Sequence, residues 1–291
     1  MIEPGKVNAS PLQMARMASF CADVISGSPG QSVRFRDGLS IPRNVFLVGK
    51  SNWIDGQTGT EGFSHSPSPL AGLLTSFGGD CRMMLRRLLE TLSVFQWVLT
   101  FLLLGVFGSL LTVYLLLTRF WPIAALYLAW LTIDNNTPER GGRRSQWVRS
   151  WAVWRYMRDY FPVSIVKMAE LDPKRNYVFG SHPHGIMCVG AFCNFCTEAT
   201  GFSRVFPGIT PHLATLSGLF CLPILRDYLL SGGGCSVSKS SLGHILSQRG
   251  MGNAVVIVVG GAAESMAGAP GVHSVLLKNR KGFVRLALTH G

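Results

Sequence analysis

The stretch AVVIVVGGAAES, residues 254–265, decides the fold of this 291-residue chain. Residues 254–259 form a β-branched run with Gly252 before it and two glycines, Gly260 and Gly261, after it. β-Branched residues favour strands, and an uninterrupted apolar run is typical of a strand that is buried on both faces. The stretch therefore predicts a strand of a partly parallel sheet, with Glu264 just beyond its end.

Further strands and helices are expected on the N-terminal side of this run and beyond it. Residues 177–179 predict a strand that leads into His182, and residues 212–216 predict a weaker one. Ser240 or Ser241 is expected to cap a helix that continues to about residue 248, and a last helix is expected at residues 282–290. Alternation of strands and helices predicts an α/β fold with its site at the strand ends.

Two histidines and a glutamate are the candidate catalytic residues. His182 and His184 follow the strand at residues 177–179, and an imidazole titrates close enough to neutrality to act as a general base. Gly185 permits close approach of a ligand to the backbone. Glu264 is a candidate to orient an imidazole, as the third member of a triad does. Structural histidines and a solvated loop glutamate are the alternative interpretations.

Cations are the candidate phosphate ligands. Arg226 lies in a short charged break of an apolar stretch, and Arg280 and Lys281 directly precede the last predicted helix. A helix N-terminus together with basic side chains favours phosphate binding. A solvated, membrane-facing patch is the alternative. The sequence has no G-x-S-x-G, Walker A or strand-linked G-x-G-x-x-G motif, which disfavours serine hydrolysis, phosphoryl transfer and hydride transfer.

A membrane segment is predicted at residues 91–133. Residues 91–118 contain no charged side chain, and after Arg119 a second uncharged run covers residues 120–133. About 20 apolar residues cross a bilayer, so the first run is long enough by itself. Basic residues flank the segment on both sides, which predicts a hairpin with both ends in the cytosol. Gly105 and Gly108 are expected to let its arms pack closely.

A helix in the lipid headgroup layer is predicted within residues 141–161. Trp147, Trp151 and Trp154 share one helical face, while Arg149, Arg155 and Arg158 lie on the others. An amphipathic helix packed on the protein's own core is the alternative interpretation.

Composition agrees with a membrane protein, since 47% of the residues are hydrophobic and only 14% are charged. The net charge of +12 arises entirely from residues 81–291, which favours anionic lipid and polyphosphorylated substrates. No motif supports binding of nucleic acid. Residues 1–80 are rich in Gly, Ser and Pro and are expected to be a disordered tail. Seven cysteines, among them Cys193 and Cys196, are expected to be free thiols and predict no metal site.

Residues 94–291 resemble the diacylglycerol acyltransferase 2 family, which includes monoacylglycerol and wax-alcohol acyltransferases. The segments that carry the resemblance are residues 136–138 (NTP), 141–147 (GGRRSQW), 160–162 (YFP), 182–185 (HPHG), 191–195 (AFCNF), 197–200 (TEAT), 260–265 (GGAAES) and 280–283 (RKGF). Phe101, Leu102 and Leu104 also fit a neutral-lipid-binding pattern of this family. The resemblance implies a membrane-anchored, glycerolipid-acyltransferase-like α/β domain at residues 141–291, preceded by a transmembrane helical hairpin.

The implied reaction is transfer of a fatty acyl group from acyl-CoA to diacylglycerol. The product, triacylglycerol, would form at the cytosolic face of the endoplasmic reticulum membrane, with lipid droplets as a further location. The implied partners are acyl-CoA as co-substrate, diacylglycerol or a related acceptor, and membrane lipid. A homo-oligomer is compatible with this reading, and neither a cofactor nor a metal is implied.

The candidate residues themselves permit a mechanism for this reaction. His182 or His184 would be the general base, Glu264 would orient it, and N–H groups near Gly185 or Gly260 would stabilise the oxyanion. The acyl-CoA phosphates would contact Arg226, Arg280 and Lys281. A local H-x4-D dyad cannot form, because the position five residues after His184 is Val189.

The sequence departs from the family pattern in two places. Ser181 stands where the family commonly has tyrosine, and the chain ends at His290-Gly291 within a familiar stretch. A catalytic domain that is cut short is therefore expected. A non-catalytic, truncated membrane protein is the alternative from another functional class.

Overall fold

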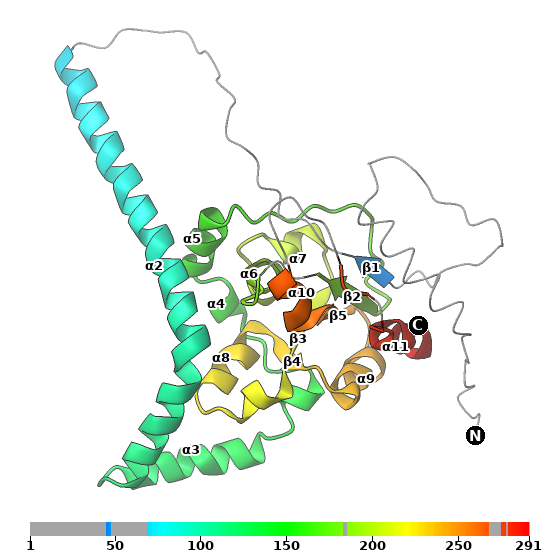
Figure 1. The fold of residues 1–291 in the computed structure, drawn as a ribbon. Helices are drawn as coiled ribbons and strands as arrows, with labels where there is room; N and C mark the ends of the chain where they lie inside the picture. The colour runs from blue at the N-terminus through cyan, green and yellow to red at the C-terminus, as the bar shows by residue number, and fades with distance from the viewer. Residues whose placement is uncertain (1–44, 48–68, 183–184, 268–274, 278, 291) are drawn as a thin grey trace, which may run out of the picture.

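The fold is a three-layer α/β domain with one long apolar helix along its side (Figure 1). The computed structural model describes residues 45–47, 69–182, 185–267, 275–277 and 279–290. One parallel sheet has the strand order β1 (Val45–Leu47), β2 (Tyr177–Ser181), β5 (Asn253–Val258), β3 (Thr210–Thr215) and β4 (Gly234–Ser236). The predicted α/β class is confirmed.

Strand β5 lies at the centre of the sheet because both of its faces are apolar. It pairs with β2 and β3, so Val255 stands between Val178 and His212. Val256 belongs to one hydrophobic cluster and Val255 to the other, on opposite faces of the sheet. The continuous apolar run at residues 254–259 thus reflects burial on both faces.

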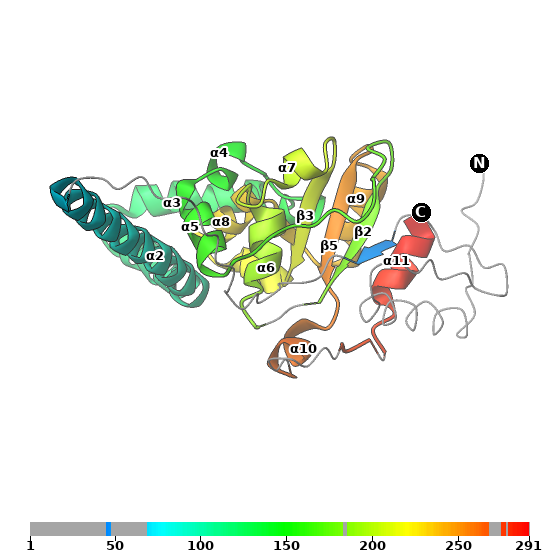
Figure 2. The same cartoon turned by 90° about the horizontal axis from the view of Figure 1, so that it is seen from above.

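Helices cover both faces of the sheet (Figure 2). The first cluster contains side chains from α2 (Pro69–Leu116), α5 (Ala152–Tyr160), the π-helical turn η2 (Phe192–Cys196) and α7 (Phe202–Val205). The second contains side chains from α9 (Lys239–Ser247) and α11 (Gly282–His290). The connecting elements are η1 (Pro138–Arg140), α4 (Gln146–Arg149), α6 (Val189–Ala191), η3 (Ser217–Cys221), α8 (Leu225–Gly232) and α10 (Gly261–Ala267).

The predicted strands lie within two residues of the observed ones, and the last helix has the predicted bounds. The cap of α9 differs, because the Ser238 side chain, rather than that of Ser240 or Ser241, accepts the Ser241 N–H. Strand β4 was not predicted. Its sequence, Gly-Cys-Ser, is too short to show a periodic pattern.

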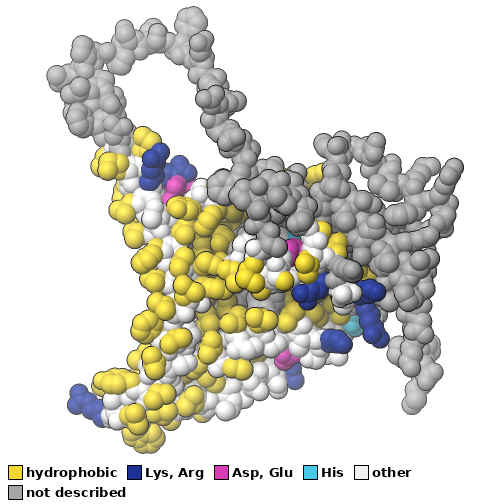
Figure 3. Space-filling model, viewed as in Figure 1, with side chains coloured by type: hydrophobic (Ala, Val, Ile, Leu, Met, Phe, Trp, Pro, Cys, Tyr) yellow, Lys and Arg dark blue, Asp and Glu magenta, His cyan; other side chains and the backbone are white. Residues whose placement is uncertain are grey.

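Helix α2 has the surface of a lipid-facing helix. Its Cys81–Leu116 portion, 36 residues, is long and apolar enough to cross a membrane. The stripe that it turns to the domain is largely small or polar, with Ser93, Gly108 and Thr112 buried. Its outward face is apolar, and Leu102 and Phe107 are each 60% exposed. A soluble helix shows the reverse arrangement. Figure 3 shows this apolar surface continuing from α2 onto the domain.

The second arm of the expected hairpin, α3 (Trp121–Ile133), turns from the end of α2 toward the sheet (Figure 1). The prediction that Gly105 and Gly108 allow two hairpin arms to pack closely was wrong. A Cβ atom on Gly108 would lie 2.5 Å from the Pro223 carbonyl oxygen, and one on Gly105 would lie 2.7 Å from Leu222 Cδ1. The glycines therefore let α2 approach the α/β domain at residues 222–225.

The single helix expected in residues 141–161 is two helices, α4 and α5, because Trp151 has an extended backbone with φ −57° and ψ 143°. Trp154 is buried in the core and its indole N–H donates to the Val148 carbonyl at 2.6 Å, whereas Trp147 is 73% exposed. Arg149 is fully buried and not on an outward face. For Trp154 the alternative interpretation, packing on the protein's own core, is confirmed.

The boundary expected at residue 80 also differs, since α2 begins at Pro69. Residues 45–47, assigned to the predicted tail, form β1 and pair with β2. The rest of that tail, residues 1–44 and 48–68, lies outside the described residues.

Candidate active site

His182 and Glu264 meet where two neighbouring parallel strands end. The Nδ1 atom of His182 lies 2.9 Å from Oε1 of Glu264, and the two side chains are only 10% and 5% exposed. His182 directly follows β2, and Glu264 lies in α10, which follows β5. Because parallel strands end at one edge of a sheet, residues 82 positions apart come into contact there. The sequence had predicted that Glu264 orients an imidazole and had left open whether it is that of His182 or of His184.

The turn after β5 is shaped to bring Glu264 back to the sheet. The Val259 N–H donates to the Ser181 carbonyl at 3.0 Å, which ties the ends of β5 and β2 together. A Cβ atom on Gly260 would lie 2.2 Å from Oε2 of Glu264, so only glycine fits at this position. Gly261 has φ +61°, a left-handed conformation that also favours glycine. The two glycines thus permit the sharp strand-to-helix turn.

The outer polar atoms of the pair, Oε2 of Glu264 and Nε2 of His182, differ in their hydrogen bonding. The Glu264 Oε2 atom accepts the main-chain N–H of Leu276 at 2.6 Å. The His182 Nε2 atom is buried and has no hydrogen-bond partner among the described residues. Nδ1 faces a carboxylate, so it carries the proton in the neutral imidazole and Nε2 carries the free lone pair. The pair can therefore accept a proton at Nε2.

The other half of the histidine motif is only partly described. Pro183 and His184 lie outside the described residues, so the prediction that His184 acts as base stays a prediction. Gly185 has φ +91°, and a Cβ atom there would meet no atom of the described residues within 4 Å. Its backbone is open to an approaching molecule.

Arg280 and Lys281 immediately precede α11. The Arg280 guanidinium is 3.5 Å from the Gly260 carbonyl, in the turn that carries Glu264. Both side chains are exposed, and Asn279 before them has φ +68°. This is the arrangement expected for a phosphate site, and that role stays a prediction.

Arg226 lies in another environment and is a correction to the sequence interpretation. It is buried in α8, and its guanidinium donates to the Asp134 carboxylate at 2.9 Å and to the Asp134 carbonyl. Asp134 caps the C-terminus of α3. A helix C-terminus attracts a cation, so the structural role explains this arginine. Its position leaves no exposed guanidinium for a phosphate.

The predicted lipid-binding residues of α2 face mostly outward. Phe101 and Leu102 are exposed and Leu104 is partly buried. The Phe101 ring lies 6.3 Å from that of Trp97, which packs on Phe192 at 3.9 Å between ring centroids. The pattern thus lies on the apolar surface of α2, one turn from the core.

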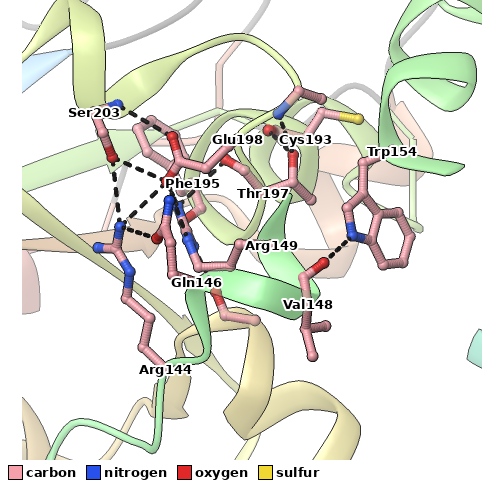
Figure 4. A network of polar contacts seen from close by, with 12 residues as sticks. Arg144, Gln146, Val148, Arg149, Trp154, Cys193, Phe195, Thr197, Glu198 and Ser203 are labelled. Carbon is pink, nitrogen blue, oxygen red and sulfur yellow. Dashed lines mark hydrogen bonds and ion pairs between the residues drawn. The ribbon is translucent and has the colours of Figure 1, made fainter. Parts of the chain in front are cut away.

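A buried arginine network, which the sequence analysis missed, joins three segments of the α/β domain (Figure 4). Arg149 donates to the carbonyls of Phe195 at 2.8 Å and Gly232 at 2.6 Å, and to Oε1 of Glu198 at 2.9 Å. Burial alone would raise the pKa of Glu198, but the hydrogen bond and charge of Arg149 outweigh it and the pKa is lowered. The network fixes α4, η2 and α8 together. No sequence signal separates Arg149 from its exposed neighbours.

The cysteines have no evident chemistry at this site. Cys193 and Cys196 are buried free thiols, as expected, and burial raises the pKa of each to about 12. In the part of the chain that the structure describes, no three His, Cys, Asp or Glu side chains are grouped so as to hold a metal ion.

The chain is similar to a known family of proteins. A family model described as diacylglycerol acyltransferase matches residues 113–291. The chain is 62% identical over 205 residues to diacylglycerol O-acyltransferase 2 of Xenopus tropicalis, covering 70% of this chain and 57% of that protein. It is 59% identical over 210 residues to the Homo sapiens protein of the same name, covering 72% and 54%. Human 2-acylglycerol O-acyltransferase 3 is 58% identical over 203 residues, covering 70% and 60%.

The chain thus spans somewhat more than half the length of these relatives. No solved structure matches it. The family model covers well over half of the chain, including His182, Glu264 and both cations before α11. This chain therefore belongs to the diacylglycerol acyltransferase family.

Proposed function

We propose that this chain is an acyl-CoA-dependent O-acyltransferase that esterifies diacylglycerol to triacylglycerol at the endoplasmic reticulum membrane. The observation that carries the proposal is the His182–Glu264 pair, with Nε2 of His182 buried and unpartnered among the described residues. An alcohol acceptor needs a base at such an atom. Membership of the family and the names of its relatives supply the class of substrate.

The proposed reaction uses no enzyme nucleophile, because a thioester is already activated. His182 Nε2 takes the hydroxyl proton of the acceptor as the hydroxyl oxygen attacks the thioester carbonyl carbon. The tetrahedral intermediate then collapses, the C–S bond breaks, and the imidazolium returns the proton to the leaving CoA thiolate. A general base of this kind contributes about 10²–10⁴-fold to the rate.

Charged and backbone groups around the pair fit the other needs of the reaction. Glu264 stabilises the imidazolium that forms during proton transfer. The open backbone at Gly185 is the candidate donor to the oxyanion. Arg280, whose guanidinium lies 3.5 Å from the Gly260 carbonyl, and Lys281, the next residue in the chain, are both exposed and are the candidate ligands of the acyl-CoA phosphates.

The membrane arrangement follows from the surfaces of α2 and α3. Both helices expose large apolar side chains, among them Phe107, Leu110 and Leu126. We place both in the bilayer, entering from the cytosolic face, since basic residues flank them on either side. The domain that packs on α2 then meets the membrane, where a diacylglycerol acceptor resides. Lipid droplets, which present the same acceptors, are a further location.

A second acceptor class has a specific observation in its favour. The identity of 58% to human 2-acylglycerol O-acyltransferase 3 is nearly that to the diacylglycerol enzymes. A monoacylglycerol acceptor is therefore the alternative substrate, and a long-chain alcohol is a third one to test.

The test is acyl transfer in microsomes that contain the chain, with labelled oleoyl-CoA and each acceptor in turn. His182→Ala, His184→Ala and Glu264→Ala are compared with His290→Ala, an exposed histidine that serves as the matched control. We expect labelled triacylglycerol from the unmodified chain and from the control, and at least a 100-fold loss in His182→Ala.

The acceptor that is used fastest identifies the substrate class. A loss confined to His184→Ala would move the general base from His182 to His184. If an inserted, folded chain gives no product with any acceptor, the enzyme proposal fails for these 291 residues and a non-catalytic role remains.

A further inference from the structure

We propose that the main-chain N–H of Leu276 holds Glu264 in the orientation in which its other oxygen faces His182, which makes Leu276 a positioning residue of the site. The inference rests on the proposed function, in which Nε2 of His182 is the base. It concerns a row of hydrogen bonds that joins three groups. The Leu276 N–H donates to Oε2 of Glu264 at 2.6 Å, and Oε1 of Glu264 lies 2.9 Å from His182 Nδ1.

The Leu276 N–H group, at one end of this row of hydrogen bonds, can only donate. A main-chain amide always donates, so Oε2 must be an acceptor. An ionised carboxylate only accepts, so Oε1 also requires a donor, and Nδ1 of His182 must carry its proton. A neutral imidazole has one ring proton, which leaves Nε2 as the lone-pair atom. The Leu276 amide therefore occupies Oε2 and leaves Oε1 to accept the Nδ1 proton, so that Nε2 is free to act as the general base.

Leu276 is held in place by its neighbours. Leu277 is buried in the second hydrophobic cluster with Phe283 of α11. The Arg280 N–H donates to the Leu277 carbonyl at 3.0 Å, and the Arg280 guanidinium reaches the Gly260 carbonyl. The Leu276 amide is thus anchored through α11 and through the turn that carries Glu264. A fixed donor is what selects one orientation of a side-chain group.

Replacement of Glu264 by glutamine tests this reasoning, because an amide has one acceptor and one donor. Its oxygen must face Leu276, so its NH₂ group faces Nδ1 of His182. Nδ1 must then accept, the ring proton moves to Nε2, and the base is lost. The reverse orientation would leave two donors facing each other at a partly buried contact, which is unfavourable.

The inference predicts an unusual order of activities. Glu264→Gln, although nearly isosteric, is expected to be at least about 100-fold slower than the unmodified chain, since the general-base contribution is lost. Glu264→Ala, which frees His182 to adopt either tautomer, is expected to be no slower than Glu264→Gln. Added formate is expected to raise the rate of Glu264→Ala, where the carboxylate site is vacant, and not that of Glu264→Gln.

The experiment uses the full chain in microsomes and in detergent. Glu170→Gln is the matched control, because it makes the same substitution at a side chain that is 88% exposed and forms an ion pair with Lys167. Microsomes give rates with labelled oleoyl-CoA and diacylglycerol. Detergent-solubilised chain labelled with ¹⁵N-histidine gives the tautomer directly, with the His182 signals assigned by their loss in His182→Ala.

The two readouts separate the inference from the proposed function. An Nδ1–H tautomer in the unmodified chain and an Nε2–H tautomer in Glu264→Gln would support the inference even if the chain makes no product. The same tautomer in both would overturn it. A Glu264→Gln variant that works within a few-fold of the unmodified chain would also overturn it, while leaving the acyltransferase activity established.

Discussion

Removal of the Arg149 guanidinium is expected to destabilise the domain strongly. Arg149 is fully buried between α4, η2 and α8, and it donates to the carbonyls of Phe195, Thr197 and Gly232 and to Glu198 (Figure 4). In Arg149→Ala three main-chain carbonyls lose a donor, at about 1 kcal/mol each. Removing one partner of a buried ion pair costs about 3–5 kcal/mol.

These contributions overlap, and Glu198 keeps two other partners. Arg144 lies 3.2 Å from its Oε1 atom, and the Ser203 hydroxyl donates to it at 2.9 Å. We therefore expect the free energy of unfolding to fall by about 4 kcal/mol in Arg149→Ala. For a domain of this size the midpoint of thermal unfolding, Tm, should fall by about 10 °C. Arg149→Lys keeps the charge but loses the forked geometry, so it should fall by about half as much.

The assay is thermal unfolding of the detergent-solubilised chain, followed by the loss of its monodisperse peak in size-exclusion chromatography. Arg155→Ala is the control, because Arg155 is exposed on the neighbouring helix α5, and surface substitutions change stability by about 0.5 kcal/mol or less. If Arg149→Ala lowers Tm no more than Arg155→Ala does, Arg149 is not the clamp that its contacts suggest.

Three further predictions concern the packing of α2, strain and pH. Gly108→Ala should weaken the docking of α2, because its Cβ atom would lie 2.5 Å from the Pro223 carbonyl; a lower Tm than that of the exposed control Val106→Ala would show this, and equal Tm values would contradict it. Ile224 has φ +65°, so Ile224→Gly should relieve strain and raise the free energy of unfolding by about 1 kcal/mol; a Tm that falls in this variant would contradict the prediction. Burial lowers the pKa of His212 to about 4, below its unfolded value of about 6.5, so its stabilisation is complete above pH 6.5 and is lost as the pH falls toward 4. At pH 5, which is about 1.5 units below the unfolded pKa, the loss is about 2 kcal/mol, and a Tm difference between pH 7.5 and pH 5 that is unchanged in His212→Gln would refute its origin.

Local patterns predicted the part of the fold that local chemistry governs. The β-branched run of β5 and the helix at Gly282–His290 were found where the sequence indicated them, because propensity and apolar periodicity agree there. The His182–Glu264 pair was also predictable, since both residues follow strand signals and parallel strands end at one edge. Belonging to the family was predictable from long motifs such as residues 141–147 and 182–185.

Only the tertiary structure decided what each charged or small residue touches. Arg149, Arg155 and Arg226 look alike in sequence, yet Arg149 is buried on Glu198, Arg155 is exposed, and Arg226 binds the end of α3. Gly108 fitted a helix hairpin equally well until its contact with Pro223 showed that α2 docks on the domain. Sequence patterns report periodicity over a few residues, whereas these contacts join positions about 50 to 115 residues apart. For that reason the sequence predicted the candidate catalytic residues at the strand ends, and it did not predict the long-range contacts of Arg149, Arg226 and Gly108.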